Sequence, residues 1–186
     1  MSVVGLVVLS PLMLVLAILV RLDSPGPSLF AQTRIGKSFR PFRLLKFRSM
    51  AHGKFGAEIT CGQDSRITRL GAILRQFKLD ELPQLWNVFC GDMSFVGPRP
   101  EVPSFVERFR AEYEEILSVR PGITDPASIR YRSEAEMLAR VPDPINYYTK
   151  VILPDKLRIS KAYVRSAKIG NDVCLIFQTL ALLFKK

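Results

Sequence analysis

The strongest constraint on the fold is an apolar stretch from Val3 to Val20 that contains no charged residue. Its length is about that of a helix that crosses the hydrocarbon core of a membrane. Ser10 and Pro11 lie in its middle, and a proline inside a helix removes a backbone hydrogen bond and causes a kink. The Ser10 hydroxyl can bond a backbone carbonyl and ease that break. Two structures fit: a helix that spans with a kink, and one that bends sharply and returns to the side it entered from.

The charge balance indicates an anionic partner. The 186-residue chain has a formal net charge of +10, which favours phospholipid headgroups, phosphorylated substrates or nucleic acid. The sequence has no zinc-finger, basic-zipper or RNA-recognition signature, so we expect no nucleic-acid partner. Cations follow the apolar stretch and indicate that this flank is cytoplasmic: Arg21, Arg34, Lys37, Arg40, Arg43, Lys46 and Arg48.

Cysteine and histidine usage argues against several kinds of site. Cys61, Cys90 and Cys174 are odd in number and far apart, so they form neither a disulfide framework nor a zinc knuckle. His52 is the only histidine, which disfavours histidine-based triads and multi-histidine metal sites.

The remaining pattern predicts a mostly helical α+β fold with a small β-hairpin. Strands are expected over Leu29–Ile35 and Phe39–Phe47, with a turn at residues 36–38 and a loop at residues 49–63. The apolar spacing predicts these helices: 66–77 capped by Asp64 or Ser65, Leu79 or Asp80 to near Gly91, 101–117, 134–139, 145–159, and 172–184 capped by Asn171. The last is too short to span a membrane, so it is a core helix or an interfacial one.

Two adjacent carboxylates, Asp80 and Glu81, come just before Pro83. Proline is tolerated in the first turn of a helix, so both acids are expected at a positive helix end. An acid pair of this kind, near arginines, suits a divalent cation with a phosphate ligand. For such a pair taken alone, simple capping of the helix is the commoner explanation. The rigid segment 96–100 would fix Arg99, a residue suited to bidentate phosphate contacts.

Several motifs together resemble one family, the monotopic phosphoglycosyl transferases, also called bacterial sugar transferases. The motifs, in order, are Ser10-Pro11, Lys46-Phe47-Arg48-Ser49-Met50, residues 64–66, residues 79–87, Gly91-Asp92-Met93-Ser94, residues 96–100 and Arg120-Pro121-Gly122-Ile123-Thr124. The resemblance covers nearly the whole chain. After Thr124 the sequence departs from the usual continuation of the family, and we interpret residues 125–132 as a subgroup difference.

The resemblance implies transfer of a sugar-1-phosphate from a UDP-sugar to a polyprenol phosphate such as undecaprenyl phosphate, with release of UMP. This reaction belongs to bacterial surface glycan synthesis. The family also implies a re-entrant membrane helix at residues 1–22, broken at Ser10-Pro11, and interfacial helices. A catalytic domain at residues 23–186 would lie on the cytoplasmic face of the inner membrane, against its phospholipid. A homo-oligomer is compatible with the sequence.

The resemblance also implies roles for single residues. Asp80 would be the nucleophile that forms an aspartyl-phosphosugar intermediate, and Glu81 would act as a metal ligand or as the base for the polyprenol phosphate. Both carboxylates would hold Mg²⁺. Arg75 and Arg99, the latter between Pro98 and Pro100, match positions near the substrate phosphates.

Two other functions compete with this one. A non-catalytic basic module that binds membrane surfaces would use the cations and leave the acid pair as a cap. An ordinary glycosyltransferase would release UDP, but the sequence has neither an Asp-x-Asp motif nor a glycine-rich nucleotide fingerprint.

Overall fold

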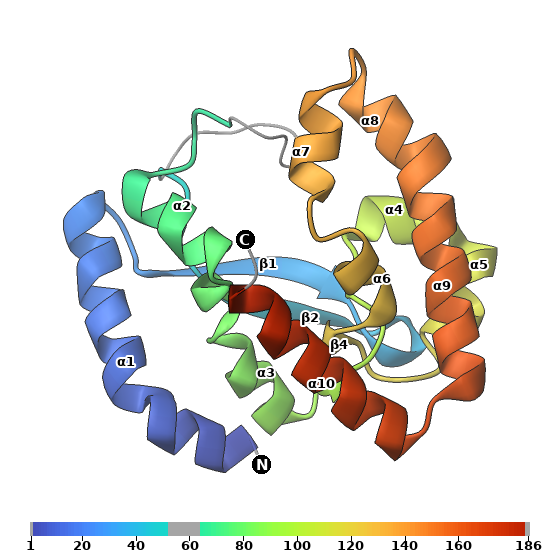
Figure 1. The fold of residues 1–186 in the computed structure, drawn as a ribbon, viewed down its shortest axis with the longest axis horizontal. Helices are drawn as coiled ribbons and strands as arrows, with labels where there is room; N and C mark the ends of the chain where they lie inside the picture. The colour runs from blue at the N-terminus through green and yellow to red at the C-terminus, as the bar shows by residue number, and fades with distance from the viewer. Residues whose placement is uncertain (1, 52–63, 185–186) are drawn as a thin grey trace.

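The computed structural model describes residues 2–51 and 64–184. His52, Cys61 and most of the expected loop at residues 49–63 lie outside the described residues. The described chain is a mostly helical α+β structure, as predicted (Figure 1). Its helices are α1 Ser2–Asp23, α2 Arg69–Gln76, α3 Gln84–Cys90, α4 Pro103–Arg108, α5 Arg110–Ile116, α6 Pro126–Arg130, α7 Glu134–Ala139, α8 Pro144–Tyr147, α9 Leu153–Ser166 and α10 Ile169–Phe184. Its strands are β1 Leu29–Ile35, β2 Pro41–Phe47, β3 Ser94–Val96 and β4 Gly122–Thr124.

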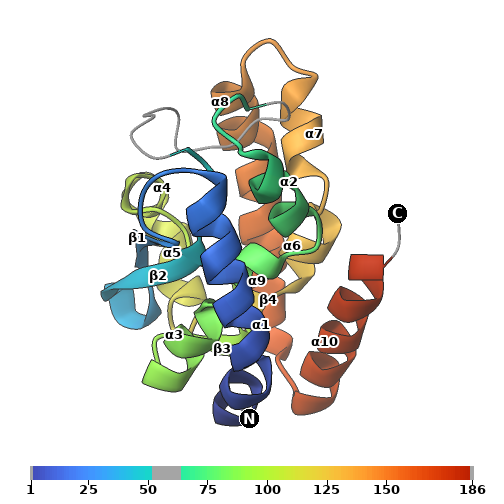
Figure 2. The same cartoon turned by 90° about the vertical axis from the view of Figure 1, so that its left-hand side faces the viewer.

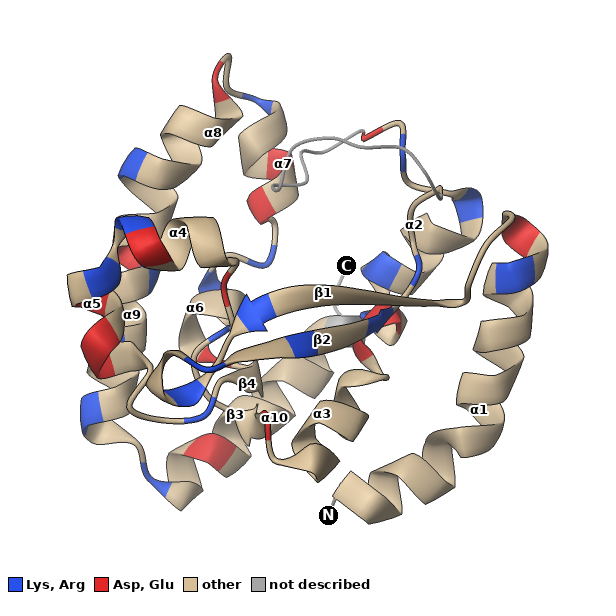
Figure 3. Cartoon of the chain, turned by 180° about the vertical axis from the view of Figure 1, so that it is seen from behind, with Lys and Arg blue, Asp and Glu red and all other residues tan. Residues whose placement is uncertain are grey.

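The apolar stretch forms the helix α1, which contains Pro11. The Ser10 hydroxyl donates to the carbonyl of Val7 at 2.8 Å, as expected beside a proline. Figure 3 shows that α1 changes direction along its length. By length and composition it could cross a membrane. Most of its large apolar side chains are exposed, and only Leu16 and Val20 are buried against the rest of the protein.

Arg48 fixes the carboxyl end of α1 to the strand β2. Its guanidinium is buried and donates to the carbonyls of Val20, Ser24 and Pro25 at 3.0, 2.6 and 2.8 Å. The last carbonyls of a helix have no partner within the helix, and a cation is favourable at that end. Arg48 therefore caps α1 from a segment that lies more than twenty residues away in the chain.

The hairpin prediction is confirmed. Strand β1 pairs antiparallel with β2, in a register that places Leu29 opposite Phe47 and Ile35 opposite Pro41. The second strand begins two residues later than expected, because Ser38 and Phe39 have left-handed φ angles of 54° and 60°. These two residues belong to the turn, and a strand cannot continue through them.

The segment around the acid pair differs from the predicted helices in two ways. Helix α2 is capped by Thr68, whose hydroxyl accepts from the amide of Gly71 at 2.9 Å, so the predicted cap at Asp64 or Ser65 is wrong. Asp64 instead pairs with Arg66.

The predicted start of the next helix, at Leu79 or Asp80, is also wrong, because residues Leu79–Glu81 form a single 3-10 turn before α3. Pro83 has no N–H to donate to the carbonyl of Leu79, so an α-helix cannot begin there.

Helix α3 is joined to β2 by Asn87. Its side chain accepts from the amide of Leu45 at 3.0 Å and donates to the carbonyl of Arg43 at 2.8 Å. Asn87 thus bonds the strand edge as a third strand would. Helix α3 ends at Gly91, as predicted, and Gly91 has the left-handed conformation with φ 84°.

The segments 96–100 and 120–126, which the sequence suggested were rigid loops, each include part or all of a short strand. Ser94–Val96 and Gly122–Thr124 pair as two short parallel strands, β3 and β4. Residues 97–100 are irregular, as expected of a segment with two prolines. A short helix, α6, follows β4 and was not predicted.

Helices α4, α5, α7, α8 and α9 contribute to the larger of two apolar clusters. Its buried residues are Val102, Phe105, Val106, Tyr113, Ile116, Leu117, Leu138, Tyr148, Ile152, Leu153 and Leu157. The α7 prediction is confirmed. The helix expected at 101–117 is two helices, divided at Phe109, and the one expected at 145–159 is α8, a π-helical turn at Tyr148–Ile152 and α9. The π turn directly precedes α9, in which Pro154 cannot donate to the carbonyl of Lys150.

Helix α10 lies at one side of the molecule (Figure 2). It begins at Ile169, so the predicted cap at Asn171 is wrong. It is joined to β4 by a hydrogen bond between the hydroxyls of Thr179 and Thr124 at 2.6 Å. Ile169, Val173 and Phe177 remain exposed on it, so α10 is not a core helix.

Gly71 is required for the packing of α2 on the segment after β2. A Cβ at this position would lie 2.1 Å from the carbonyl oxygen of Ser49. We expect Gly71→Ala to destabilise the protein by about 1–3 kcal/mol, because α2 must shift. Thermal unfolding in detergent measures this effect. Gly170→Ala is the matched control, because nothing lies within 4 Å of a Cβ there. Equal melting temperatures for the two variants would contradict the packing described.

Candidate active site

The acid pair lies in the 3-10 turn between α2 and α3. Lys78 precedes it in the left-handed conformation, with φ 55°, which costs a residue with a side chain roughly 1–2 kcal/mol. Asp80 and Glu81 are both buried, with 5% and 8% of their surface exposed. Burial of two adjacent carboxylates is unfavourable unless cations compensate. Because the pair is not in the first turn of an α-helix, the compensation comes from side chains.

Glu81 is held by two cations from distant segments. Its Oε1 atom accepts from Lys46 Nζ and from Arg99 Nη2, both at 2.8 Å. Burial by itself raises the pKa of Glu81, but the charges of Arg99 and Lys46 outweigh it and hold the pKa well below its usual range. Glu81 is therefore ionised at neutral pH. Burial lowers the pKa of Lys46, against the opposing charge of Glu81.

Asp80 differs from its neighbour. Its Oδ1 atom is buried and has no hydrogen-bond partner within residues 2–51 and 64–184. Burial raises the pKa of Asp80, and Lys46 opposes that rise. An oxygen of this kind is costly to the folded state, and it is available to bond a ligand or to attack one.

Arg75 approaches the pair from the end of α2. Its Nε atom donates to the Ser49 hydroxyl at 2.8 Å, which fixes the guanidinium over the segment after β2. Burial lowers the pKa of Arg75, while the nearby charge of Asp80 raises it. The structure thus brings together Asp80, Glu81, Arg75 and Arg99, which the sequence analysis had singled out.

Pro98 and Pro100 differ from Arg99 in how far they are exposed to solvent. Both are buried, whereas the Arg99 side chain is 37% exposed. The carbonyl of Pro98 accepts from the amide of Gly122, and the carbonyl of Pro100 accepts from Arg34. The prolines therefore fix the backbone around Arg99, and Arg99 carries the charge. The opposing charge of Glu81 raises the pKa of Arg99 above its usual value.

Lys46 is the residue of this site that the sequence analysis did not select. It entered only as one of the cations after the apolar stretch and as part of the motif Lys46-Phe47-Arg48-Ser49-Met50. The relevant signal is its place in the predicted strand Phe39–Phe47, because residues 46 and 47 of a strand face opposite sides. Phe47 points into the core, so Lys46 must point away from it, toward the acid pair.

The donor set fits one kind of metal site. No group of three or more His, Cys, Asp or Glu side chains capable of holding a metal occurs in the described part of the chain. A dedicated protein cage is therefore absent from those residues. Mg²⁺ is commonly held by one or two carboxylates, with water and substrate phosphates as further ligands. The unpartnered Oδ1 of Asp80, beside Glu81, fits that arrangement.

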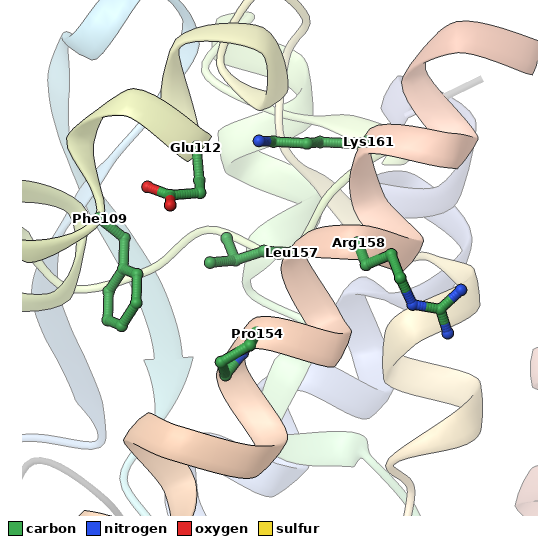
Figure 4. A pocket seen from close by; sticks show the side chains of 6 residues that line it. All are labelled: Phe109, Glu112, Pro154, Leu157, Arg158 and Lys161. Atoms are coloured by element: carbon green, nitrogen blue, oxygen red, sulfur yellow. The ribbon is translucent and has the colours of Figure 1, made fainter.

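A hollow elsewhere on the surface lies between α5 and α9, with a volume of about 330 Å³. Phe109 and Glu112 line one side of it, and Pro154, Leu157, Arg158 and Lys161 line the other (Figure 4). None of the acid-pair residues contributes to it.

Comparison with known proteins gives the family. A family model described as bacterial sugar transferase matches residues 1–186. A UDP-N-acetylgalactosamine-undecaprenyl-phosphate N-acetylgalactosaminephosphotransferase of Aeromonas hydrophila is 38% identical over 96% of this chain and 40% of that protein. The UDP-glucose:undecaprenyl-phosphate glucose-1-phosphate transferase of Escherichia coli is 34% identical over 94% of this chain and 36% of its own length. The protein of the same name from Caulobacter vibrioides is 45% identical over 65% of this chain and 47% of its own.

The chain thus spans less than half the length of these three relatives. The family match, in contrast, extends over every residue of the chain, including the acid pair and the cations around it. The chain therefore belongs to the bacterial sugar transferase family.

Proposed function

We propose that this protein transfers a sugar-1-phosphate from a UDP-sugar to undecaprenyl phosphate and releases UMP, as a step in bacterial surface polysaccharide synthesis. The names of the relatives describe transferases of this kind. The observation that carries the proposal is the buried Oδ1 of Asp80, which bonds no other group in the described chain. Lys46 and Arg75 lie near Asp80, and Arg99 binds the neighbouring Glu81. Such a group of cations attracts a pyrophosphate.

The transfer has two steps. An Asp80 oxygen attacks the β-phosphorus of the UDP-sugar, the bond from that phosphorus to the bridging oxygen breaks, and UMP leaves with the electron pair. The sugar-phosphate is then bound to Asp80 as an acyl phosphate. A phosphate oxygen of undecaprenyl phosphate attacks the same phosphorus and restores the Asp80 carboxylate. Because the steps are separate, the water-soluble and lipid substrates need not bind together.

Electrostatics decides whether a carboxylate can attack a polyanion. Arg75 and Arg99 offset the repulsion between Asp80 and the diphosphate, and fixed charges in a partly dry site are more effective than charges in water. Glu81 keeps Arg99 and Lys46 in place. Its low pKa makes it a weak base at neutral pH, so of its two expected roles we favour metal ligand over general base. Mg²⁺ held by Asp80 and Glu81 would neutralise charge on the diphosphate.

The lipid substrate requires a membrane site. We propose that residues 1–22 form a re-entrant helix and that residues 23–186 lie on the cytoplasmic face of the inner membrane. The exposed apolar surface of α1, its change of direction and the Ser10–Val7 hydrogen bond support this arrangement. The basic residues after α1 favour the cytoplasmic side.

A non-catalytic module that binds membrane surfaces remains the competing function. In that protein the acid pair would be a helix cap, and Asp80 would accept from backbone amides. Asp80 Oδ1 accepts from no donor among the described residues, and Lys78, not an acid, holds the cap position of the turn.

The released nucleotide tests the proposal directly. We expect detergent-solubilised protein, supplied with Mg²⁺, undecaprenyl phosphate and a panel of UDP-sugars, to release UMP from at least one donor. Asp80→Asn should abolish release while the melting temperature changes little, because the two side chains have nearly the same shape. UDP in place of UMP would indicate ordinary glycosyl transfer. Substantial UMP release by the variant would remove Asp80 from its role.

The pH dependence tests the charge state of Asp80. Only the carboxylate is nucleophilic, so activity should fall as the pH falls through the pKa of Asp80, which burial places above its usual value. Lys46 lowers that pKa, so Lys46→Met should move the acid limb of the rate profile to higher pH. Lys37→Met, an exposed lysine in the hairpin turn, is the control and should leave the profile unchanged. Coincident acid limbs for Lys46→Met and the wild type would contradict the assignment.

Labelling of the N-terminus tests the re-entrant helix. A cysteine introduced at Ser2, in a background without native cysteines, should react with a membrane-impermeant thiol reagent only from the cytoplasmic side. Replacing both Ser10 and Pro11 with alanine should straighten α1 and make that site reactive from the periplasm. If the labelling side is the same for the two proteins, the break at Ser10-Pro11 does not set the topology.

A further inference from the structure

The loops after β3 and β4 are held together by their backbones. The amide of Gly97 donates to the carbonyl of Thr124, and the amide of Gly122 donates to the carbonyl of Pro98, both at 3.0 Å. A Cβ at Gly122 would lie 2.1 Å from the amide nitrogen of Gly97, so only glycine permits this approach. Parallel pairing places the residues that follow each strand side by side. Arg99 follows β3, and Asp125 follows β4.

Asp125 is a buried carboxylate that uses only one of its oxygens. Its Oδ1 atom accepts from the amide of Ser128 at 2.8 Å and caps α6. The whole residue is 1% exposed. Neither Asp125 Oδ2 nor the Ser128 hydroxyl has a hydrogen-bond partner in the portion of the chain that the structure describes. Capping alone does not require a charge here, because asparagine and serine cap helices about as well as aspartate.

Asp125 and Arg99 line the same small cavity. Asp125, Ser128, Arg99 and Lys156 all line it, and its volume of about 30 Å³ is sufficient for one water molecule. Lys156, the other cation of the lining, forms a salt bridge with Glu134, and Glu101, the other carboxylate, binds Arg34 and Tyr148. The two charged groups of the lining that remain are Asp125 and Arg99. The charge of Glu81 raises the pKa of Arg99 most, and the charge of Asp125 adds to that rise.

We propose that Asp125 is a positioning residue, which holds the Arg99 guanidinium across this cavity while Glu81 holds it at the acid pair. Arg99 is then fixed from two sides and presents its remaining N–H groups to the substrate phosphate in one orientation. The role at the phosphate rests on the proposed function, whereas the restraint on Arg99 does not.

The first test measures Arg99 itself and needs no activity. In protein labelled with ¹⁵N-arginine, the Nε–H resonance of Arg99 is assigned by its loss in Arg99→Lys. Asp125→Asn keeps the cap and the shape but removes the charge, so it should shift or broaden that resonance. Asp143→Asn is the matched control, because Asp143 caps α8 in the same way from an exposed position. An Arg99 resonance that is unchanged in Asp125→Asn overturns the proposal.

The second test is a double-mutant cycle on kcat/KM for UMP release. Asp125→Asn should lower kcat/KM about tenfold, and in the Arg99→Lys background it should have no further effect. Independent, multiplicative losses would show that Asp125 does not act through Arg99, and would overturn the proposal. Absence of UMP release by the wild type would instead reject the proposed function, and the Arg99 resonance would then decide the restraint alone.

Discussion

The structure depends on the buried Glu81 carboxylate and the two cations that it binds. Lys46 comes from the hairpin, Glu81 from the turn between α2 and α3, and Arg99 from the segment after β3. Removing one partner from a buried ion pair typically costs about 3–5 kcal/mol, because it leaves an uncompensated charge. The three segments are therefore held in one arrangement, and that arrangement leaves the neighbouring Asp80 oxygen unpartnered. The charged cluster and the unpartnered oxygen of Asp80 thus have the same structural origin.

The strand β2 and the residue after it link the apolar helix α1 to this charged group. Lys46 reaches the acid pair, Phe47 packs in the cluster that contains Leu16 and Val20 of α1, and Arg48 caps the carboxyl end of α1. Three consecutive residues thus serve the site, the core and the apolar helix. For the proposed enzyme, with one lipid substrate and one soluble substrate, this coupling would hold Asp80 at a fixed height above the membrane.

Arg99 is a partly exposed cation whose flexible side chain is held in place by its surroundings. Its backbone lies between two buried prolines, and the β3–β4 pairing holds that backbone from the other side. Ordering a long side chain costs conformational entropy, and contacts already present in the free protein remove part of that cost from substrate binding. Glu81 supplies one such contact, and Asp125 is placed to supply another.

Local patterns in the sequence determined the apolar helix with its internal Pro11, the period-two strands of the hairpin, α7 and the end of α3 at Gly91, because each depends on residues close together in the chain. The motifs also selected Asp80, Glu81, Arg75 and Arg99. Only the tertiary structure decided the rest. The parallel pairing of β3 with β4 and the contacts of Lys46 and Arg48 join segments far apart in sequence. Such contacts form where backbone groups and buried charges must find partners, and no local pattern encodes which partner they find.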